Sequence, residues 1–202
     1  MKKILVSAFT IFAMVAVVAT GTRAVFSDTE TSTGNTFAAG SLDLNLDGGN
    51  VNVVKFNVSG MRPGSQSIKT WALKNVGSLN GYLDLTDISF SSDENGCLDP
   101  ETDAGDVTCG TPGLGEGELA NVLGITLFID QNGNGWFDTG DIKFYDGLMK
   151  DLPALFNLNE VLNAGVTKNV TAQVNWGSTP DDNKAQGDSV TLNLSFTLGQ
   201  NP

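Results

Sequence analysis

Apolar and polar residues alternate along most of the chain beyond residue 40, with the two-residue period of β-strands. Glycine-rich turns separate the alternating stretches. In 166–176, Val166 is predicted to share an inward face with Val170 and Trp176. The last stretch places these residues on one face: Val190, Leu192, Leu194, Phe196 and Leu198. Strands are predicted at 41–46, 51–58, 66–75, 81–90, 122–130, 142–145, 166–176 and 190–198.

The segment 151–162 departs from this alternation. Its apolar residues recur with helix-like spacing: Leu152, Leu155, Phe156 and Leu162. Asp151 can cap a helix, Pro153 fits its first turn, and Gly165 can end it. The pattern predicts one or two short helices over a sheet opening.

Many strands, glycine-rich turns and one helical insertion predict an all-β fold. We expect a jelly-roll-like two-sheet sandwich with one or two short helices and an extended N-terminal arm. The chain of 202 residues is long enough for one such domain with a leader. The predicted parts are a signal peptide at 1–24, an arm at 25–40 and the β-domain at 41–202.

The first residues read as an export signal. Lys2 and Lys3 precede an uncharged apolar run at 4–22, and small residues follow it. Cleavage is predicted between Ala24 and Val25. The apolar run is also long enough to span a bilayer, so a membrane-anchored surface protein or a pilin-like helical core stays open as the alternative.

The chain is strongly acidic. Removing residues 1–24 changes the formal charge from −12 to −15, because those residues hold three basic side chains and no acidic one. Such a domain repels nucleic acid and anionic membranes and attracts divalent cations. Membrane contact is therefore expected only for the precursor.

The two cysteines, Cys97 and Cys109, predict one disulfide in an exported chain. Two buried free thiols or a metal pair are the alternatives. The bridge would tie a long acidic excursion at 91–118. Its acids could hold a cation, with Asp93, Glu94, Asp99 and Asp103 as candidates, but a solvated acidic loop is the expected state.

A calcium loop is predicted at 130–141. Oxygen-bearing side chains occupy positions 1, 3, 5, 9 and 12 of a twelve-residue coil with glycine at position 6, the spacing of an EF-hand-type loop. The proposed ligands are Asp130, Asn132, Asn134, the carbonyl of Trp136, Asp138 and Asp141. Calcium would have a structural role there. A plain hairpin turn is the alternative.

Three predicted N-glycosylation sequons, Asn-x-Ser/Thr, begin at Asn57, Asn169 and Asn193. Asn169 and Asn193 fall on the polar side of alternating strands and are expected to be exposed. Asn57 lies in a predicted strand whose alternation of apolar and polar residues is less regular, so the sequence does not assign it to an exposed face.

Several motifs together resemble the TasA/camelysin family of secreted fibre-forming proteins, including its archaeal pilus-forming relatives. The residues that carry the resemblance are Val25-Phe26-Ser27-Asp28, the run 35–44, Met61-Arg62-Pro63-Gly64, Asn75-Val76-Gly77-Ser78 and the run 183–190. The family implies a jelly-roll domain that polymerises by donating its N-terminal strand to the next subunit.

The segment 27–36 agrees with this implication, because it has no large apolar residue to bury in its own domain. The expected donor-strand residues are the anchors Val25, Phe26 and Phe37 with Thr29, Thr31 and Thr33 between them. The predicted function is a pilin-like subunit of an extracellular filament on the cell surface, with a biofilm or adhesion role and itself as partner.

Two other classes compete with a filament subunit. One is a monomeric or membrane-tethered surface module that binds calcium or a carbohydrate. The other is a secreted hydrolase, because camelysin-type relatives carry the name of metalloproteases. The chain has no histidine, so neither a His-Glu-x-x-His zinc motif nor a Ser-His-Asp triad can form, and no enzyme activity is expected.

Overall fold

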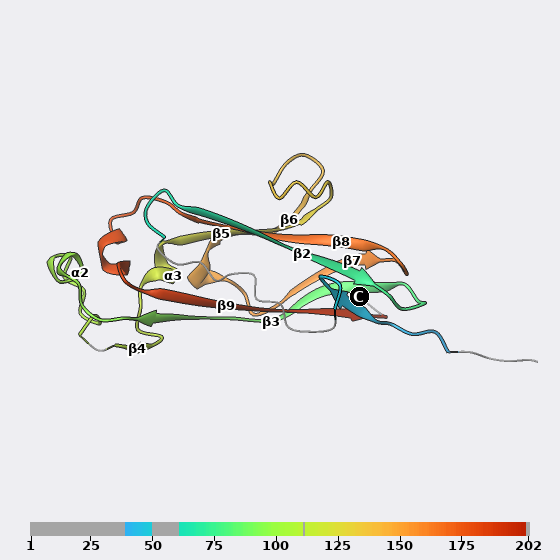
Figure 1. Ribbon diagram of the computed structural model, residues 1–202, viewed down its shortest axis with the longest axis horizontal. Coiled ribbons are helices and arrows are strands. Elements are labelled where there is room, and N and C mark those ends of the chain that lie inside the picture. The colour runs from blue at the N-terminus through green and yellow to red at the C-terminus, as the bar shows by residue number, and fades with distance from the viewer. Residues whose placement is uncertain (1–38, 50–60, 111, 201–202) are drawn as a thin grey trace, which may run out of the picture. The chain divides into compact units, whose positions relative to one another are not determined.

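Two antiparallel sheets build the described part of the protein (Figure 1). The structure is a computed structural model that describes residues 39–49, 61–110 and 112–200. These belong to a unit running from Ala39 to Pro202. The predicted signal peptide, most of the arm, the strand at 51–58 and Asn57 lie outside the described residues.

The first sheet contains five strands in the order β1-β2-β8-β5-β6. Their bounds are Leu44–Leu46, Gln66–Asn75, Thr167–Trp176, Leu123–Asp130 and Ile142–Leu148. β2 and β8 pair from Gln66↔Asn175 to Lys74↔Thr167, and β8 pairs with β5 along its other edge. The central strands are therefore hydrogen-bonded on both sides.

The second sheet is built around β3 (Gly81–Glu94). On one side β3 pairs with β9 (Ser189–Gly199), from Tyr82↔Gly199 to Asp93↔Ser189. On the other side β7 (Phe156–Leu162) pairs with the start of β3, and β4 (Gly113–Leu114) pairs with its end. Within the described residues, no strand pairs with the outer edge of β9.

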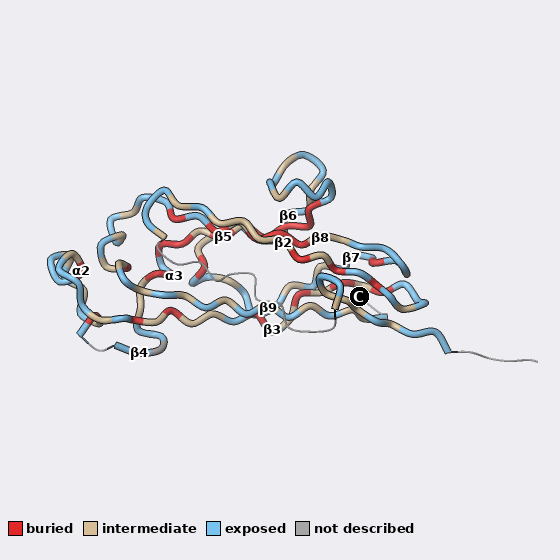
Figure 2. The backbone as a smooth tube through the Cα atoms, in the orientation of Figure 1, coloured by how far each residue is buried: buried red, intermediate tan, exposed pale blue. Residues whose placement is uncertain are grey.

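The core lies between the two sheets, where buried positions line their facing sides (Figure 2). Trp71 of β2 packs against Phe196 of β9, with ring centroids 5.8 Å apart. Leu85 and Leu127, one from each sheet, are completely buried. Burial of each such leucine contributes about 1.5–3 kcal/mol relative to exposure. These contacts confirm the all-β two-sheet sandwich.

The prediction of one or two short helices at 151–162 is wrong. Met149–Asp151 is a short 3-10 helix, η1, and the rest of the segment includes strand β7. Along β7 the side chains alternate between inward and exposed positions, and Phe156 and Leu158 pack on the core. The edge of β3 offers hydrogen-bond partners to the backbone of 156–162 when this segment is extended. An isolated helix of this length is only marginally stable, so pairing with β3 favours the strand over the helix.

The α-helices lie instead within and directly after the acidic excursion. α2 spans Asp99–Asp103 and α3 spans Leu119–Val122. The predicted range 66–75 is confirmed as β2, whereas β3 extends beyond its predicted end to Glu94. Val166 lies before β8 with 41% of its surface exposed, so its predicted inward position is wrong. No helix in the described ranges is long and apolar enough to cross a membrane.

Candidate functional site

The predicted calcium loop connects β5 to β6. Asp130, the last residue of β5, is 2% exposed, while Asn132 and Asn134 are exposed. Phe137 packs edge-on against Phe128 of β5, with ring centroids 5.5 Å apart. Gln173 of β8 also donates to the carbonyl of Gly135 at 2.9 Å, so the loop is attached to the sheet at its first residue, through the Phe137 ring and through this hydrogen bond.

Every carboxylate oxygen of this loop accepts a hydrogen bond. Asp130 accepts from the backbone N–H groups of Gly133 and Gly135 at 2.6 and 2.8 Å. Asp138 accepts from the side-chain amides of Asn132 and Asn134. Asp141 accepts from the backbone N–H groups of Gln131 and Asp138. The structure thus brings the predicted side chains together, and it pairs Asp138 with the two asparagines and the other two carboxylates with backbone N–H groups.

Calcium would have to replace some of these hydrogen bonds. The two asparagine amides point their N–H groups at Asp138, and their oxygens accept from backbone N–H groups of Asn134 and Trp136. Calcium binding by the loop stays a prediction.

The predicted disulfide is confirmed. Cys97 and Cys109 are bonded, with their Cα atoms 4.5 Å apart. The bridge closes a segment that contains α2 and the turn after it. It thereby lowers the conformational entropy of this segment in the unfolded chain.

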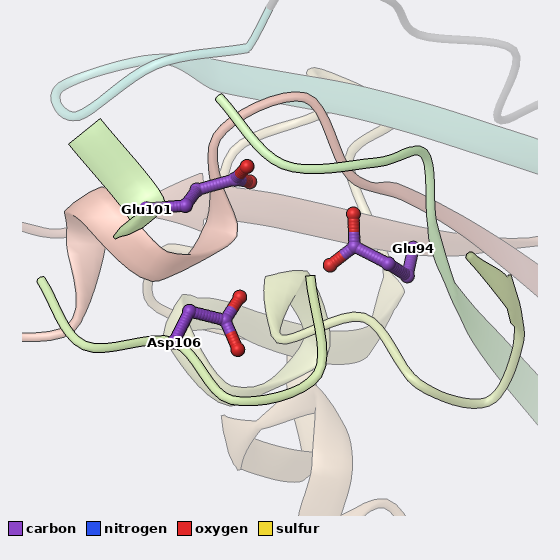
Figure 3. A group of neighbouring side chains, drawn as sticks. All are labelled: Glu94, Glu101 and Asp106. Carbon is purple, nitrogen blue, oxygen red and sulfur yellow. The ribbon is translucent and has the colours of Figure 1, made fainter. Parts of the chain in front are cut away.

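A cluster of carboxylates lies beside this bridge. We call it the acidic cluster; its members are Glu94, Glu101, Asp106, Glu118 and Asp188. Glu94 ends β3, Glu101 lies in α2, and Asp188 immediately precedes β9. One oxygen each from Glu94, Glu101 and Asp106 lies within 4.8 Å of the other two (Figure 3). Glu94 forms a second such triad with Glu118 and Asp188.

Backbone N–H groups orient most of these side chains. Glu94 accepts from Gly96 at 2.6 Å, and Glu101 accepts from Leu98 at 2.6 Å. Asp188 accepts from the N–H of Glu118 at 2.6 Å. Each of these contacts uses one oxygen of the carboxylate and leaves the other to point elsewhere.

Thr108 joins the remaining two members. Its hydroxyl oxygen lies 2.7 Å from an oxygen of Asp106 and 2.7 Å from an oxygen of Glu118. A hydroxyl has one proton, so it can donate to only one of them at a time. The backbone N–H of Thr108 also donates to Asp106 at 2.8 Å.

The acidic cluster perturbs its own pKa values. Burial, reinforced by the nearby charges of Glu94 and Glu118, raises the pKa of Asp188 to about 7. Burial is also the main cause that raises the pKa values of Glu101 and Glu118. At Asp106 burial acts in the same direction, but hydrogen bonds from Thr108 and Cys109 outweigh it and lower the pKa.

Sequence reasoning found only one member of the cluster. Of the four candidates in the excursion, Glu94 belongs to it. Asp93, its neighbour in β3, is half-buried and is not a member, and Asp99 and Asp103 are exposed on α2. Glu101, on the same helix, is completely buried. Asp188 comes from a distant part of the sequence, so no local spacing could have linked it to the excursion.

The remaining predicted positions are the sequon asparagines and the donor-strand residues. Asn193 is exposed on β9, as expected, whereas Asn169 of β8 is half-buried beside the calcium loop, near Gly133. The donor-strand residues Val25 to Phe37 lie outside the described residues.

A family model described as camelysin metallo-endopeptidase matches residues 1–106, just over half of the 202-residue chain. None of the curated proteins matches the chain. The name of that family implies a catalytic metal, most often zinc held by nitrogen or sulfur ligands. The donor set of the acidic cluster consists of oxygen atoms, the chain has no histidine, and both cysteines are in the disulfide. These residues do not fit a zinc protease centre.

Proposed function

The chain belongs to the camelysin metallo-endopeptidase family, and we propose that it is a structural subunit of an extracellular filament, like the TasA-type fibre proteins that it resembles. In this proposal the N-terminal arm of one copy pairs with a sheet edge of the next copy. Export of the chain and removal of residues 1–24 would free the arm at Val25.

The observation that carries this proposal is the outer edge of β9. Its range, Ser189–Gly199, makes it the second-longest strand of the described fold, and it is paired only through β3 there. An edge strand of this length offers a row of backbone N–H and C=O groups to an added strand. Natural proteins usually shorten or block such an edge unless it is used.

The inner face beside this edge is incompletely covered. Leu192, Leu194 and Phe196 of β9 contact the core, yet each is only half-buried. An added strand would bring apolar side chains onto this side of the sheet. Val25, Phe26 and Phe37 are the arm residues suited to that contact, and the threonines between them favour extended backbone.

Such a contact is heterologous, because the arm and the β9 edge are different surfaces. Head-to-tail contacts of this kind propagate into open fibres unless the rotation between copies closes a ring. The acidic charge of the chain opposes close packing of copies, so backbone hydrogen bonds and apolar anchors would have to offset repulsion.

A structural role also agrees better with the side chains than proteolysis does. Without histidine, and with both cysteines in the disulfide, the chain cannot supply the nitrogen and sulfur ligands on which protein zinc sites usually rely. We therefore assign no catalytic residue.

Electron microscopy of the mature protein, 25–202, tests the proposal. Wild type should form regular filaments, whereas Phe26→Ser with Phe37→Ser should give dispersed particles with unchanged circular dichroism. Thr31→Ser is the matched control and should keep the filaments. Filaments from a variant that lacks 25–36 would refute strand donation, and dispersed wild-type particles would favour a membrane-tethered calcium-binding surface module instead.

A synthetic peptide of residues 25–37 gives a second test. Added in excess, it should occupy the open edge and shorten wild-type filaments. A peptide with both phenylalanines replaced by serine should have no effect. Equal effects from the two peptides would contradict the proposed role of the anchors.

A further inference from the structure

The acidic cluster holds more buried negative charge than its protein partners compensate. Glu101 is completely buried and Glu94 is 4% exposed. Among the described residues, no lysine or arginine forms an ion pair with any of the five members. Ionised carboxylates in such surroundings are costly unless a cation or strong hydrogen bonds compensate them.

One oxygen of every member has no hydrogen-bond partner in the structure. These oxygens are Oε2 of Glu94, Oε1 of Glu101, Oδ2 of Asp106, Oε2 of Glu118 and Oδ1 of Asp188. The side chain of Glu94, at the end of β3, converges with those of Glu101 and Asp106 from the disulfide-closed segment (Figure 3). Native proteins rarely leave buried polar atoms unpaired, and one common reason is an ion that binds there.

The calcium loop shows the opposite state. All its carboxylate oxygens accept hydrogen bonds from the chain itself, and no three of its acids converge as the cluster members do. Of the two acidic regions, the cluster therefore has the greater unmet demand for positive charge.

We propose that Glu94, Glu101, Asp106, Glu118 and Asp188 form a calcium site. Carboxylate oxygens are the ligands of hard cations, and calcium accepts six to eight of them. Oxygens within 4.8 Å of one another, as in each triad, can all reach one ion at calcium–oxygen distances of about 2.3–2.6 Å. Magnesium usually keeps several waters and binds only one or two carboxylates, so a cluster of five carboxylates suits calcium better.

The site has a route for the ion. A pocket of about 520 Å³ is lined by Ser92, Thr108, Gly117 and Glu118, among others. Thr108 and Glu118 belong to the pocket wall and contact each other, so solvent reaches the edge of the cluster there. The Thr108 hydroxyl could turn its proton away and present its oxygen to the ion.

A bound ion would connect four parts of the fold. Glu101 and Asp106 lie inside the disulfide-closed segment, and Glu94 ends β3. Glu118 directly precedes α3, and Asp188 directly precedes β9. Asp93 and Ser189, the residues next to two of these ligands, are register partners in the β3–β9 pair. Calcium would therefore fix the excursion to the start of β9.

The test uses Glu101→Gln, which keeps the side-chain shape and removes one buried charge. The full chain is stripped with a chelator and titrated with calcium chloride by calorimetry, and its melting temperature is measured in both states. Asp99→Asn is the matched control, because it removes an exposed charge from the same helix.

We expect calcium to raise the melting temperature of wild type and of Asp99→Asn. In Glu101→Gln the cluster should lose at least tenfold in calcium affinity, and the calcium-induced rise should shrink. In chelator, Glu101→Gln should melt no lower than wild type, because it relieves an unpaired buried carboxylate. Asp188→Asn should behave in the same way if Glu101→Gln fails to fold.

Two results would overturn the proposal. One is the absence of a calcium-induced rise in stripped wild type. The other is a calcium titration of Glu101→Gln and Asp188→Asn that matches wild type, which would assign any bound calcium to another place such as the loop at 130–141. Neither result bears on filament formation, which the microscopy measures separately.

Discussion

Removal of the disulfide tests how the acidic excursion is held. The perturbation is Cys97→Ala with Cys109→Ala. Alanine avoids placing a hydroxyl at Cys109, which is only 4% exposed. The bridge spans a sequence separation of 12, and the segment it closes contains α2, Glu101 and Asp106. Without the bridge the unfolded chain gains freedom that folding must then remove.

The magnitude follows from loop closure. For a separation of 12 residues, the chain-entropy model gives about 3 kcal/mol at 25 °C. In a domain of this size each kcal/mol lowers the melting temperature by about 2–4 °C, so the variant should melt about 6–12 °C below wild type. If the acidic cluster binds calcium, its affinity should fall by at most about 100-fold, the equivalent of the same free energy.

The assay is thermal unfolding followed by tryptophan fluorescence, in chelator and in calcium. Wild type treated with a reductant is the internal control, since it breaks the same bond without a substitution and should show the same loss. A loss below about 2 °C in both preparations would refute the reasoning. It would mean that contacts of α2, rather than the bridge, restrict the segment in the unfolded chain.

Three further perturbations address other parts of the fold. Asn75→Ala removes a buried amide that donates to two backbone carbonyls and accepts from one backbone N–H. Chemical denaturation should show that the free energy of unfolding falls by about 3 kcal/mol, and a fall below about 1 kcal/mol would contradict this expectation. Burial acts to raise the pKa of Asp182, but hydrogen bonds, led by the one from the Trp176 indole N–H, outweigh burial and lower the pKa below the ordinary value of 3.8. The ionised carboxylate therefore stabilises the fold above that pH. Asp182→Asn should melt below wild type at neutral pH, and the difference in melting temperature should narrow as the pH falls below about 3.8. A difference that stays constant would refute the ionic contribution. Asp130→Ala with Asp138→Ala should lower the melting temperature more in calcium than in chelator, whereas equal losses would show that this loop binds no cation.

The sequence predicts the sandwich well where one face of a strand is buried along its whole length. β2 agrees with its predicted range because Trp71 and Leu73 alternate with more exposed residues. The segment 151–162 fails because its leucines satisfy two periods at once. Only the open side of β3, a distant segment, selects the extended form. Tertiary pairing of that kind leaves no local signal.

The candidate sites divide in the same way. The disulfide was predictable because the chain has only two cysteines. The loop at 130–141 is local, so its side chains could be placed near one another from spacing. The acidic cluster unites residues from 94 to 188, and membership depends on which face of α2 is buried. A helix of five residues is too short for a periodic pattern to reveal that face.

The long sequence separation between β3 and β9 has a consequence for the order in which the acceptor edge forms. β3 is complete once residue 94 has been synthesised, but its longest partner begins only at Ser189. A chain that is still being translated therefore lacks the strand whose outer edge would accept another copy. If copies join by strand donation to this edge, as proposed above, a chain can accept another copy only after β9 has paired with β3.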